Sequence, residues 1–240
     1  MNFIKGVVLR NMPPETSYLS KLPMVRCLRD SGGLILEKPV TFFVGENGTG
    51  KSTLIEAIAV EAGFNAEGGS FDHTFTTNDT CSNLNEYISL LKSVIPDDGF
   101  FLRAESFYNA ASYVDKNGQL SRYGGVSLHE QSHGESFLAL VKNRFTGNGL
   151  YIMDEPEAAV SPQRQLALIA LIDKLAKQNS QFIIATHSPI LMAYPNADIF
   201  QFSDSGIKKV NYTDTEHYKV TKMFIDDHER IMHYLLDQKE

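Results

Sequence analysis

The stretch that decides the fold runs from Pro39 to Ala62 and reads PVTFFVGENGTGKSTLIEAIAVEA. Its first part, up to Gly45, is a short apolar and aromatic-rich run bounded by Pro and Gly, which is typical of a buried strand. From Lys51 the apolar residues follow a helical spacing, and Gly63 supplies a stop signal. The sequence therefore predicts a strand, a glycine-rich loop and a helix in direct succession. One face of this helix carries the apolar residues Leu54, Ile55, Ile58, Ala59 and Ala62.

The loop between these elements, Gly45 to Thr53, matches the pattern G-x-x-x-x-G-K-[ST] in the strand-to-helix context that the pattern requires. Its glycines leave room for backbone N–H groups to turn toward an anion, and the positive end of the next helix points at the same place. We expect this phosphate cradle to bind ATP with Mg²⁺, with Lys51 on the β- and γ-phosphates and the Ser52 hydroxyl on the metal. The predicted nucleotide-binding residues are Gly45, Glu46, Asn47, Gly48, Thr49, Gly50, Lys51, Ser52 and Thr53.

A second motif follows the apolar run Leu150–Met153, which ends in Asp154 and Glu155. An apolar strand that ends in two acids places Asp154 at the carboxyl edge of the sheet beside the glycine-rich loop, where it can hold Mg²⁺. Glu155 is then placed to polarise water. A plain acidic turn before Pro156 is the alternative interpretation, and the neighbouring loop motif argues against it. The motif predicts Asp154 as a metal ligand and Glu155 as a catalytic residue.

Between these motifs lies Gln131–Glu135 (QSHGE), which is similar to the LSGGQ or LSGGE signature of ABC ATPases. With all three motifs the chain resembles this family. The resemblance implies that Ser132, Gly134 and Glu135 open a helix and grip a γ-phosphate held by another subunit. His133 replaces the first glycine of the signature, and an ordinary Ser N-cap with Glu135 completing a capping box is the alternative. The apolar residues expected to share a face of this helix are Leu138, Val141 and Phe145.

Three further positions have roles that the resemblance implies. His187, in the run ATHSP, stands where ABC ATPases carry the switch histidine that contacts the γ-phosphate; a structural histidine is the alternative. Glu105 is the candidate for the Q-loop position that senses Mg²⁺, against the alternative of a surface carboxylate. Ser161 occupies the place of the D-loop, where the family usually has Asp. The expected catalytic residues are Lys51, Glu155 and His187, and the expected metal ligands are Ser52, Asp154 and Glu105.

The run Asp154–Pro162 (DEPEAAVSP) favours one branch of this family. It looks more like the DEPE-x-x-L-x-P of soluble predicted ATPases allied to the OLD, RecF and SMC groups than like the DEPTSALD of transporters. The THSP around His187 points the same way. No heptads separate Lys51 from Ser132, so a compact head without coiled-coil arms is expected. The resemblance covers roughly residues 40–191.

The remaining pattern predicts an α/β fold of the P-loop NTPase class. Apolar runs alternate with helical stretches, such as the one that opens at Ser161-Pro162, so we expect a mostly parallel core sheet with flanking helices. Residues 64–126 contain glycine pairs, a Thr/Asn-rich patch and an amphipathic stretch at 84–94, which together predict a small, partly helical lobe. We expect residues 1–240 to form a single ABC-type ATPase domain.

The two ends of the chain add further elements. Met1–Arg10 has no signal-peptide pattern and is interpreted as a first strand, which gives the domain an N-terminal β portion. Residues 198–204 and 207–212 are expected to form a strand pair, and residues 217–236 a closing helix.

Composition excludes several classes of protein. The formal net charge of −7 has the wrong sign for a surface that coats nucleic acid, so nucleic acid could bind only through a local patch or a partner. Cys27 and Cys81 form no CxxC pair, which indicates reduced thiols rather than a disulfide or zinc site. No apolar stretch approaches the roughly 20 residues of a membrane span. We expect a cytoplasmic protein with no direct membrane insertion.

The sequence thus predicts an ATPase that works as a clamp. Two copies are expected to close head to tail around ATP and to drive a conformational change in an unidentified protein partner, in DNA maintenance or defence. A second interpretation makes the chain the ATP-binding subunit of an ABC transporter. A third makes it a nucleotide-gated regulator that hydrolyses ATP slowly.

Overall fold

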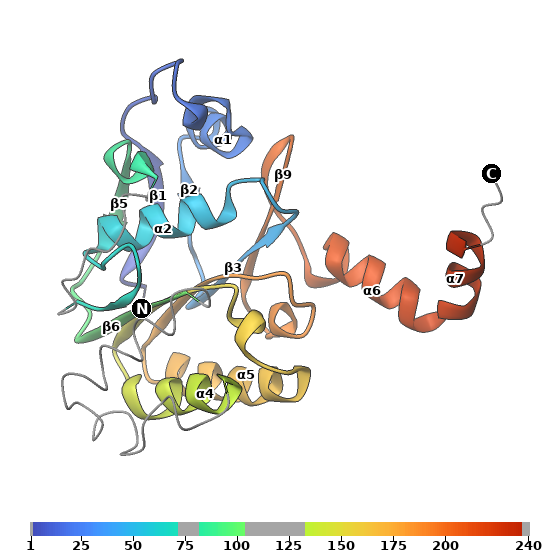
Figure 1. The fold of residues 1–240 in the computed structure, drawn as a ribbon. Coiled ribbons are helices and arrows are strands. Elements are labelled where there is room, and N and C mark those ends of the chain that lie inside the picture. Colours follow the sequence, from blue (N-terminus) through green and yellow to red (C-terminus); the bar gives the residue numbers. More distant parts are fainter. Residues whose placement is uncertain (1, 72–81, 104–132, 237–240) are drawn as a thin grey trace.

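The computed structural model describes residues 2–71, 82–103 and 133–236 (Figure 1). Within these ranges the core is a seven-stranded sheet whose strands, in spatial order, are β10 (Gly206–Lys209), β9 (Asp198–Ser203), β3 (Val40–Gly45), β8 (Gln181–Ala185), β7 (Gly149–Asp154), β6 (Asp98–Arg103) and β4 (Gly69–Ser70). The pairs from β9 to β6 are parallel, and β10 and β4 run antiparallel to their neighbours. The predicted α/β fold with a mostly parallel sheet is confirmed.

The central strands are buried on both faces, which is why they read as continuous apolar runs. Helix α2 (Lys51–Ala62) covers one face of the sheet, and α4 (His133–Arg144) and α5 (Pro162–Ala176) cover the other (Figure 1). Successive side chains of β3 alternate between the two cores, with Phe43 packed toward α2 and Phe42 toward α4 and α5. Both flanking layers are needed to bury such strands.

A second, three-stranded antiparallel sheet lies on the far side of α2, so that this helix sits between two sheets (Figure 1). Its strands are β2 (Leu34–Ile35), β1 (Ile4–Leu9) and β5 (Ile88–Lys92). Helix α1 (Pro23–Ser31) packs beside β1 and β10. The first strand expected within Met1–Arg10 is confirmed, and it belongs to this N-terminal β portion.

The expected helical lobe is wrong over the part of it that the structure describes. The amphipathic stretch at 84–94 forms a short 3₁₀ turn, Asn83–Glu86, and then strand β5, which pairs with β1 in the register Leu9↔Ile88. A short apolar run fits helical and strand periods equally well, and here pairing with β1, which is distant in the chain, decides between them. Residues 98–103 form β6. Residues 104–126 lie outside the described residues.

The C-terminal segment differs from the prediction in one respect. The expected strand pair is present as β9 and β10, but the closing helix is divided into α6 (Glu216–Asp226) and α7 (His228–Leu236). Asp227 separates them with φ −152° and ψ 59°, which is not helical. Both helices extend away from the sheets (Figure 1). No described helix has the length and apolar character that crossing a membrane requires.

A polar cluster stabilises the amino-terminal end of β7, opposite the edge that carries the motifs. The fully buried Tyr151 hydroxyl accepts a hydrogen bond from the Thr146 N–H at 2.6 Å and lies 2.9 Å from Oδ2 of Asp98. Asp98 also pairs with Arg144 at 2.6 Å. Burial raises the pKa of the Tyr151 phenol far above its ordinary value, with the Asp98 carboxylate adding to the shift.

Tyr151→Phe should lower the free energy of unfolding by about 1–3 kcal/mol, because it leaves the buried Thr146 N–H and the Asp98 carboxylate short of a partner. Chemical denaturation of the two proteins measures this difference. Tyr18→Phe is the control, since that side chain is 58% exposed and should change stability little. An unchanged midpoint for Tyr151→Phe would contradict the structural role of the cluster.

Candidate functional site

Three parallel strands end at one edge of the large sheet and bring the sequence motifs together. β3 ends at Gly45 and leads through the loop into α2 at Lys51. β7 ends at Asp154, and β8 ends at Ala185, just before Thr186 and His187. Because β8 pairs with both β3 and β7 in parallel, the three loops start side by side.

The glycine-rich loop adopts a backbone that side chains rarely allow. Gly45, Gly48 and Gly50 have φ values of +135°, +82° and +95°. A Cβ on Gly45 would lie 2.2 Å from the Phe202 carbonyl oxygen of β9, so no other residue fits there. At Gly48 a Cβ would meet nothing within 4 Å, which leaves the loop backbone open to an approaching ligand. The loop therefore fits a group that packs against main-chain N–H donors.

Lys51, the first residue of α2, is buried at the base of this loop with 4% exposure. Its Nζ donates hydrogen bonds to the carbonyl oxygens of Gly45 at 2.7 Å and Glu46 at 2.8 Å. Burial lowers the pKa of this amine, and the carboxylates of Glu155 and Asp154 act in the opposite direction. A buried ammonium group beside the loop suits a strongly anionic ligand.

The metal ligands predicted on these elements, Ser52 and Asp154, lie together. The Ser52 hydroxyl donates to Oδ1 of Asp154 at 3.3 Å, and Asp154 is buried. This donor set is a hydroxyl and a carboxylate, which suits Mg²⁺, an ion that keeps several waters and takes few protein ligands. The described residues contain no group of three or more His, Cys, Asp or Glu that could hold a metal. Asp154 Oδ2 is also 3.7 Å from Nε of Arg103, a neighbour that sequence reasoning missed.

Glu155 projects from a strained turn directly after β7. Its φ and ψ are both 51°, in the left-handed region, at a cost of the order of 1–3 kcal/mol for a residue with a Cβ. Its N–H donates to the Ala185 carbonyl at 3.0 Å, which holds the turn against β8. The side chain is 41% exposed, and Oε1 lies 3.6 Å from Nε2 of His187. The turn thus keeps this carboxylate in reach of both solvent and the histidine.

Glu157 anchors the loop that carries His187, and sequence reasoning assigned it no role. One carboxylate oxygen accepts from the Thr186 hydroxyl at 2.7 Å, and the other accepts from the His187 N–H at 2.5 Å. Burial raises the pKa of Glu157, against these two hydrogen bonds. The signal in the sequence was the third acid of the DEPE run, which we used only to choose a branch of the family.

The imidazole of His187 contacts a second histidine that sequence reasoning also missed. Nδ1 of His187 lies 3.0 Å from Nε2 of His217, in the first turn of α6. Burial lowers the pKa of His187, and the charge on Lys51 lowers it further. No pattern in the chain pointed to His217, because it lies on a different element and belongs to no recognised motif.

The candidate signature segment is described only in part. Ser132 lies outside the described residues, as does Glu105. Gly134 is buried near Arg164 of α5, and a Cβ added to Gly134 would lie 2.5 Å from Nη1 of Arg164. Glu135 is exposed and pairs with the same Arg164 at 3.0 Å. Helix α4 begins at His133, and its buried face is formed by Phe137, Leu140 and Val141, whereas Leu138 is only partly buried.

Two family models match successive parts of the sequence. A model described as "AAA domain" matches residues 25–121, and one described as "AAA ATPase domain" matches residues 125–192. The second match covers Asp154, Glu155 and His187, and the first covers the whole glycine-rich loop. These matches support ATP hydrolysis as the activity of the chain.

Among curated proteins, the chain is similar to the ribose import ATP-binding protein RbsA from Bacillus cereus. The two are 26% identical over 183 residues, which is 67% of this chain but 36% of RbsA. The chain therefore corresponds to about a third of that relative. Among solved structures, it resembles a metal-chelate-type ABC transporter in an inward-facing conformation, with a TM-score of 0.50, 16% identity, and coverage of 94% of this chain and 90% of the other.

It also resembles CbiO1 from Clostridium perfringens, part of the ABC transporter complex CbiONQ, with a TM-score of 0.50 at 15% identity. That comparison covers 98% of this chain and 99% of CbiO1. The similarity to solved structures establishes the fold, and the matches to the AAA family models support ATP hydrolysis. The fold is thus that of ABC ATPase domains, and the AAA matches, the glycine-rich loop and the acidic pair together support a P-loop ATPase.

Glu157→Gln should change how stability depends on pH. Because the folded-state pKa of Glu157 is raised, its contribution is complete below the unfolded value of 4.5 and is lost as the pH rises through the folded value. The wild type should therefore lose stability relative to the variant as the pH rises from about 4 to 7. Denaturation at several pH values measures the difference, and Glu37→Gln, an exposed carboxylate, is the control. A difference that does not vary with pH would contradict the raised pKa.

Proposed function

We propose that this chain binds ATP·Mg²⁺ on Gly45–Thr53 and hydrolyses it with Glu155 and His187. The observation that supports this is the gathering of Lys51, Asp154 and His187 at the carboxyl ends of three adjacent parallel strands. Backbone N–H groups of the loop would cradle the phosphates, since the glycines place no side chain in the way.

Each charged group in the proposed site has a distinct task. Lys51 Nζ, now held by two backbone carbonyls, would exchange them for β- and γ-phosphate oxygens. Ser52 and Asp154 would hold Mg²⁺, which would neutralise phosphate charge as the γ-phosphoryl group leaves. Glu155 would polarise the attacking water, and Nε2 of His187 would contact the γ-phosphate. Glu105 and Ser132 remain predictions from the sequence.

The proposal extends to an ATP-dependent dimer. In it, the phosphates bound by one copy meet Ser132–Glu135 of a second copy, so that ATP lies between the two subunits. Binding would close the dimer and hydrolysis would reopen it, which moves a partner protein. The support for this step is the signature-like sequence and its place at the start of α4.

Glu155→Gln should trap the ATP-bound dimer and lower the ATP turnover number by about 100-fold or more, because a neutral amide lacks the charge and the basicity with which a carboxylate activates water. Size-exclusion chromatography with light scattering, run with ATP and Mg²⁺, measures the dimer. Glu229→Gln, a carboxylate on α7, is the matched control and should turn over ATP normally. If Glu155→Gln stays monomeric at micromolar concentration, the clamp is wrong.

Lys51→Ala should abolish nucleotide binding, because it removes the one ammonium group that the P-loop carries and leaves the cradle to its N–H donors alone. Isothermal titration with ATP and Mg²⁺ measures the loss. Lys92→Ala, whose Nζ is bound to the Glu61 carbonyl away from the loop, is the control. Unchanged affinity in Lys51→Ala would contradict the proposed site.

The likeness to RbsA favours a second candidate, an ATP-binding subunit of a transporter. Two measurements separate the candidates. Stimulation of turnover by DNA would favour a role in DNA maintenance or defence. Recovery of a membrane permease with the Glu155→Gln variant would favour the transporter.

A further inference from the structure

The contact between His187 and His217 is a directed hydrogen bond between two imidazoles. Their rings lie 5.1 Å apart between centroids with an interplanar angle of 64°, and Nδ1 of His187 is 3.0 Å from Nε2 of His217. In this edge-on geometry the nitrogen lone pair of one ring points at the N–H of the other ring. One nitrogen must be the donor and the other the acceptor, so each ring is confined to one tautomer.

The remaining two nitrogens decide which ring donates. Nε2 of His187 and Nδ1 of His217 are both buried and have no hydrogen-bond partner among the described residues. If His187 donated, its Nε2 lone pair would face the Glu155 carboxylate at 3.6 Å, and His217 would keep an unpaired N–H. If His217 donates, an N–H of His187 faces the Glu155 carboxylate at the same 3.6 Å, and His217 keeps an unpaired lone pair. A carboxylate attracts an N–H and repels a nitrogen lone pair, and a buried N–H that faces no acceptor at all is costly, so the second arrangement is favoured.

Both rings are favoured in the neutral form. Burial lowers the pKa of each histidine, and the Lys51 ammonium lowers both further. A neutral imidazole can donate from Nε2 only if Nδ1 carries no proton. The partner at Nδ1 therefore determines whether His187 offers a donor or a lone pair to the nucleotide site.

We propose that His217 is a positioning residue. Its Nε2–H donates to Nδ1 of His187 and holds that ring in the tautomer whose Nε2–H points toward Glu155 and toward an incoming γ-phosphate. This inference rests on the role of His187 in the proposed function. It assigns to the first turn of α6 a part in the ATPase reaction.

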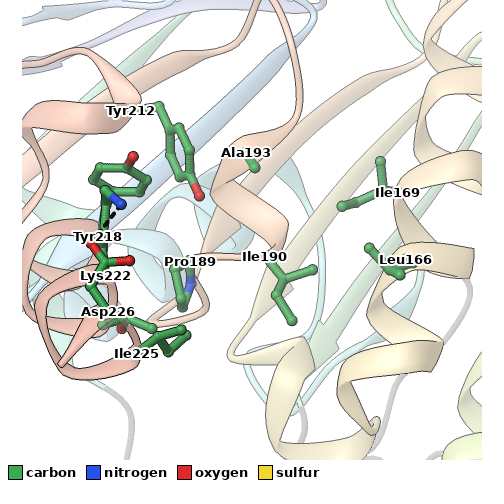
Figure 2. Close-up of a pocket in the computed structure, with 11 residues that line it drawn as sticks. Leu166, Ile169, Pro189, Ile190, Ala193, Tyr212, Tyr218, Lys222, Ile225 and Asp226 are labelled. Atoms are coloured by element: carbon green, nitrogen blue, oxygen red, sulfur yellow. Dashed lines mark hydrogen bonds and ion pairs between the residues drawn. The ribbon is translucent and has the colours of Figure 1, made fainter. Parts of the chain in front are cut away.

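The surroundings of His217 hold it in place for this task. Thr215 is buried, caps α6 by accepting from the Tyr218 N–H at 3.3 Å, and donates to the Tyr212 carbonyl at 2.8 Å. A cavity of about 520 Å³ is lined by Tyr212, by Tyr218 of α6, and by Pro189 and Ile190, which follow His187 in the chain (Figure 2). Helix α6 thus lines the same cavity as the loop that follows His187.

A series of substitutions at His217 in the full chain tests the direction of the bond. His217→Ala should lower kcat for ATP about 10-fold or more with little change in KM, since partners of this kind are worth about 10–100-fold. His217→Gln keeps an N–H donor and should recover kcat to within about threefold of wild type. His217→Glu can only accept when ionised, would draw the proton to Nδ1, and should be no better than His217→Ala. His228→Gln, on α7, is the matched control and should leave kcat unchanged.

A direct measurement needs no turnover. Long-range ¹H–¹⁵N spectra of the imidazoles in the nucleotide-free protein should show His187 protonated on Nε2 in the wild type and in His217→Gln. A proton on Nδ1 of His187 in the wild type would overturn the proposal. Equal loss of kcat in His217→Ala and His217→Gln, with both variants folded, would also overturn it, because that pattern marks a structural role.

The proposed function and this inference can fail separately. If Lys51→Ala and Glu155→Gln hydrolyse ATP normally, the proposed site is wrong, and the spectra still report the tautomer. If those variants are inactive while His217→Ala keeps the wild-type kcat, the site stands and the positioning role of His217 is wrong.

Discussion

The approach of β9 to the end of β3 constrains everything else in this structure. The Phe202 carbonyl lies where a Cβ of Gly45 would be, so the chain must leave the sheet there with a glycine backbone and turn at once into the loop. The same turn sets the start of α2, and α2 in turn is packed between both sheets. The geometry of the loop therefore depends on the packing of the whole domain core.

Around this loop a buried ammonium group lies close to two carboxylates. Lys51 is buried among carbonyls and near Asp154 and Glu155, and burial opposes its charge. The strained turn at Glu155 places a second carboxylate close to His187, where its charge also acts on Lys51. Bringing triphosphate and metal together would satisfy both signs of charge at once, which is a physical reason for coupling binding to a change of conformation.

The sequence predicted local features with good accuracy, and distant pairings poorly. Helix α2 has the bounds expected from its spacing, and the strand pair at 198–209 formed as expected, because each signal lies within a few neighbouring residues. The stretch at 84–94 was misread, since β5 is stabilised by pairing with β1, which lies far away in the chain. The closing helix was expected to be continuous, but the backbone of Asp227 interrupts it.

By itself the sequence determined the glycine-rich loop, the acidic pair after β7 and the class of fold, because each follows from residue types at fixed short spacings. Only the tertiary structure decided that Glu157 holds the His187 loop and that His217 meets His187. Those contacts join side chains from separate elements across a parallel sheet. These contacts depend on strand order and helix placement, and neither produces a periodic pattern in the sequence.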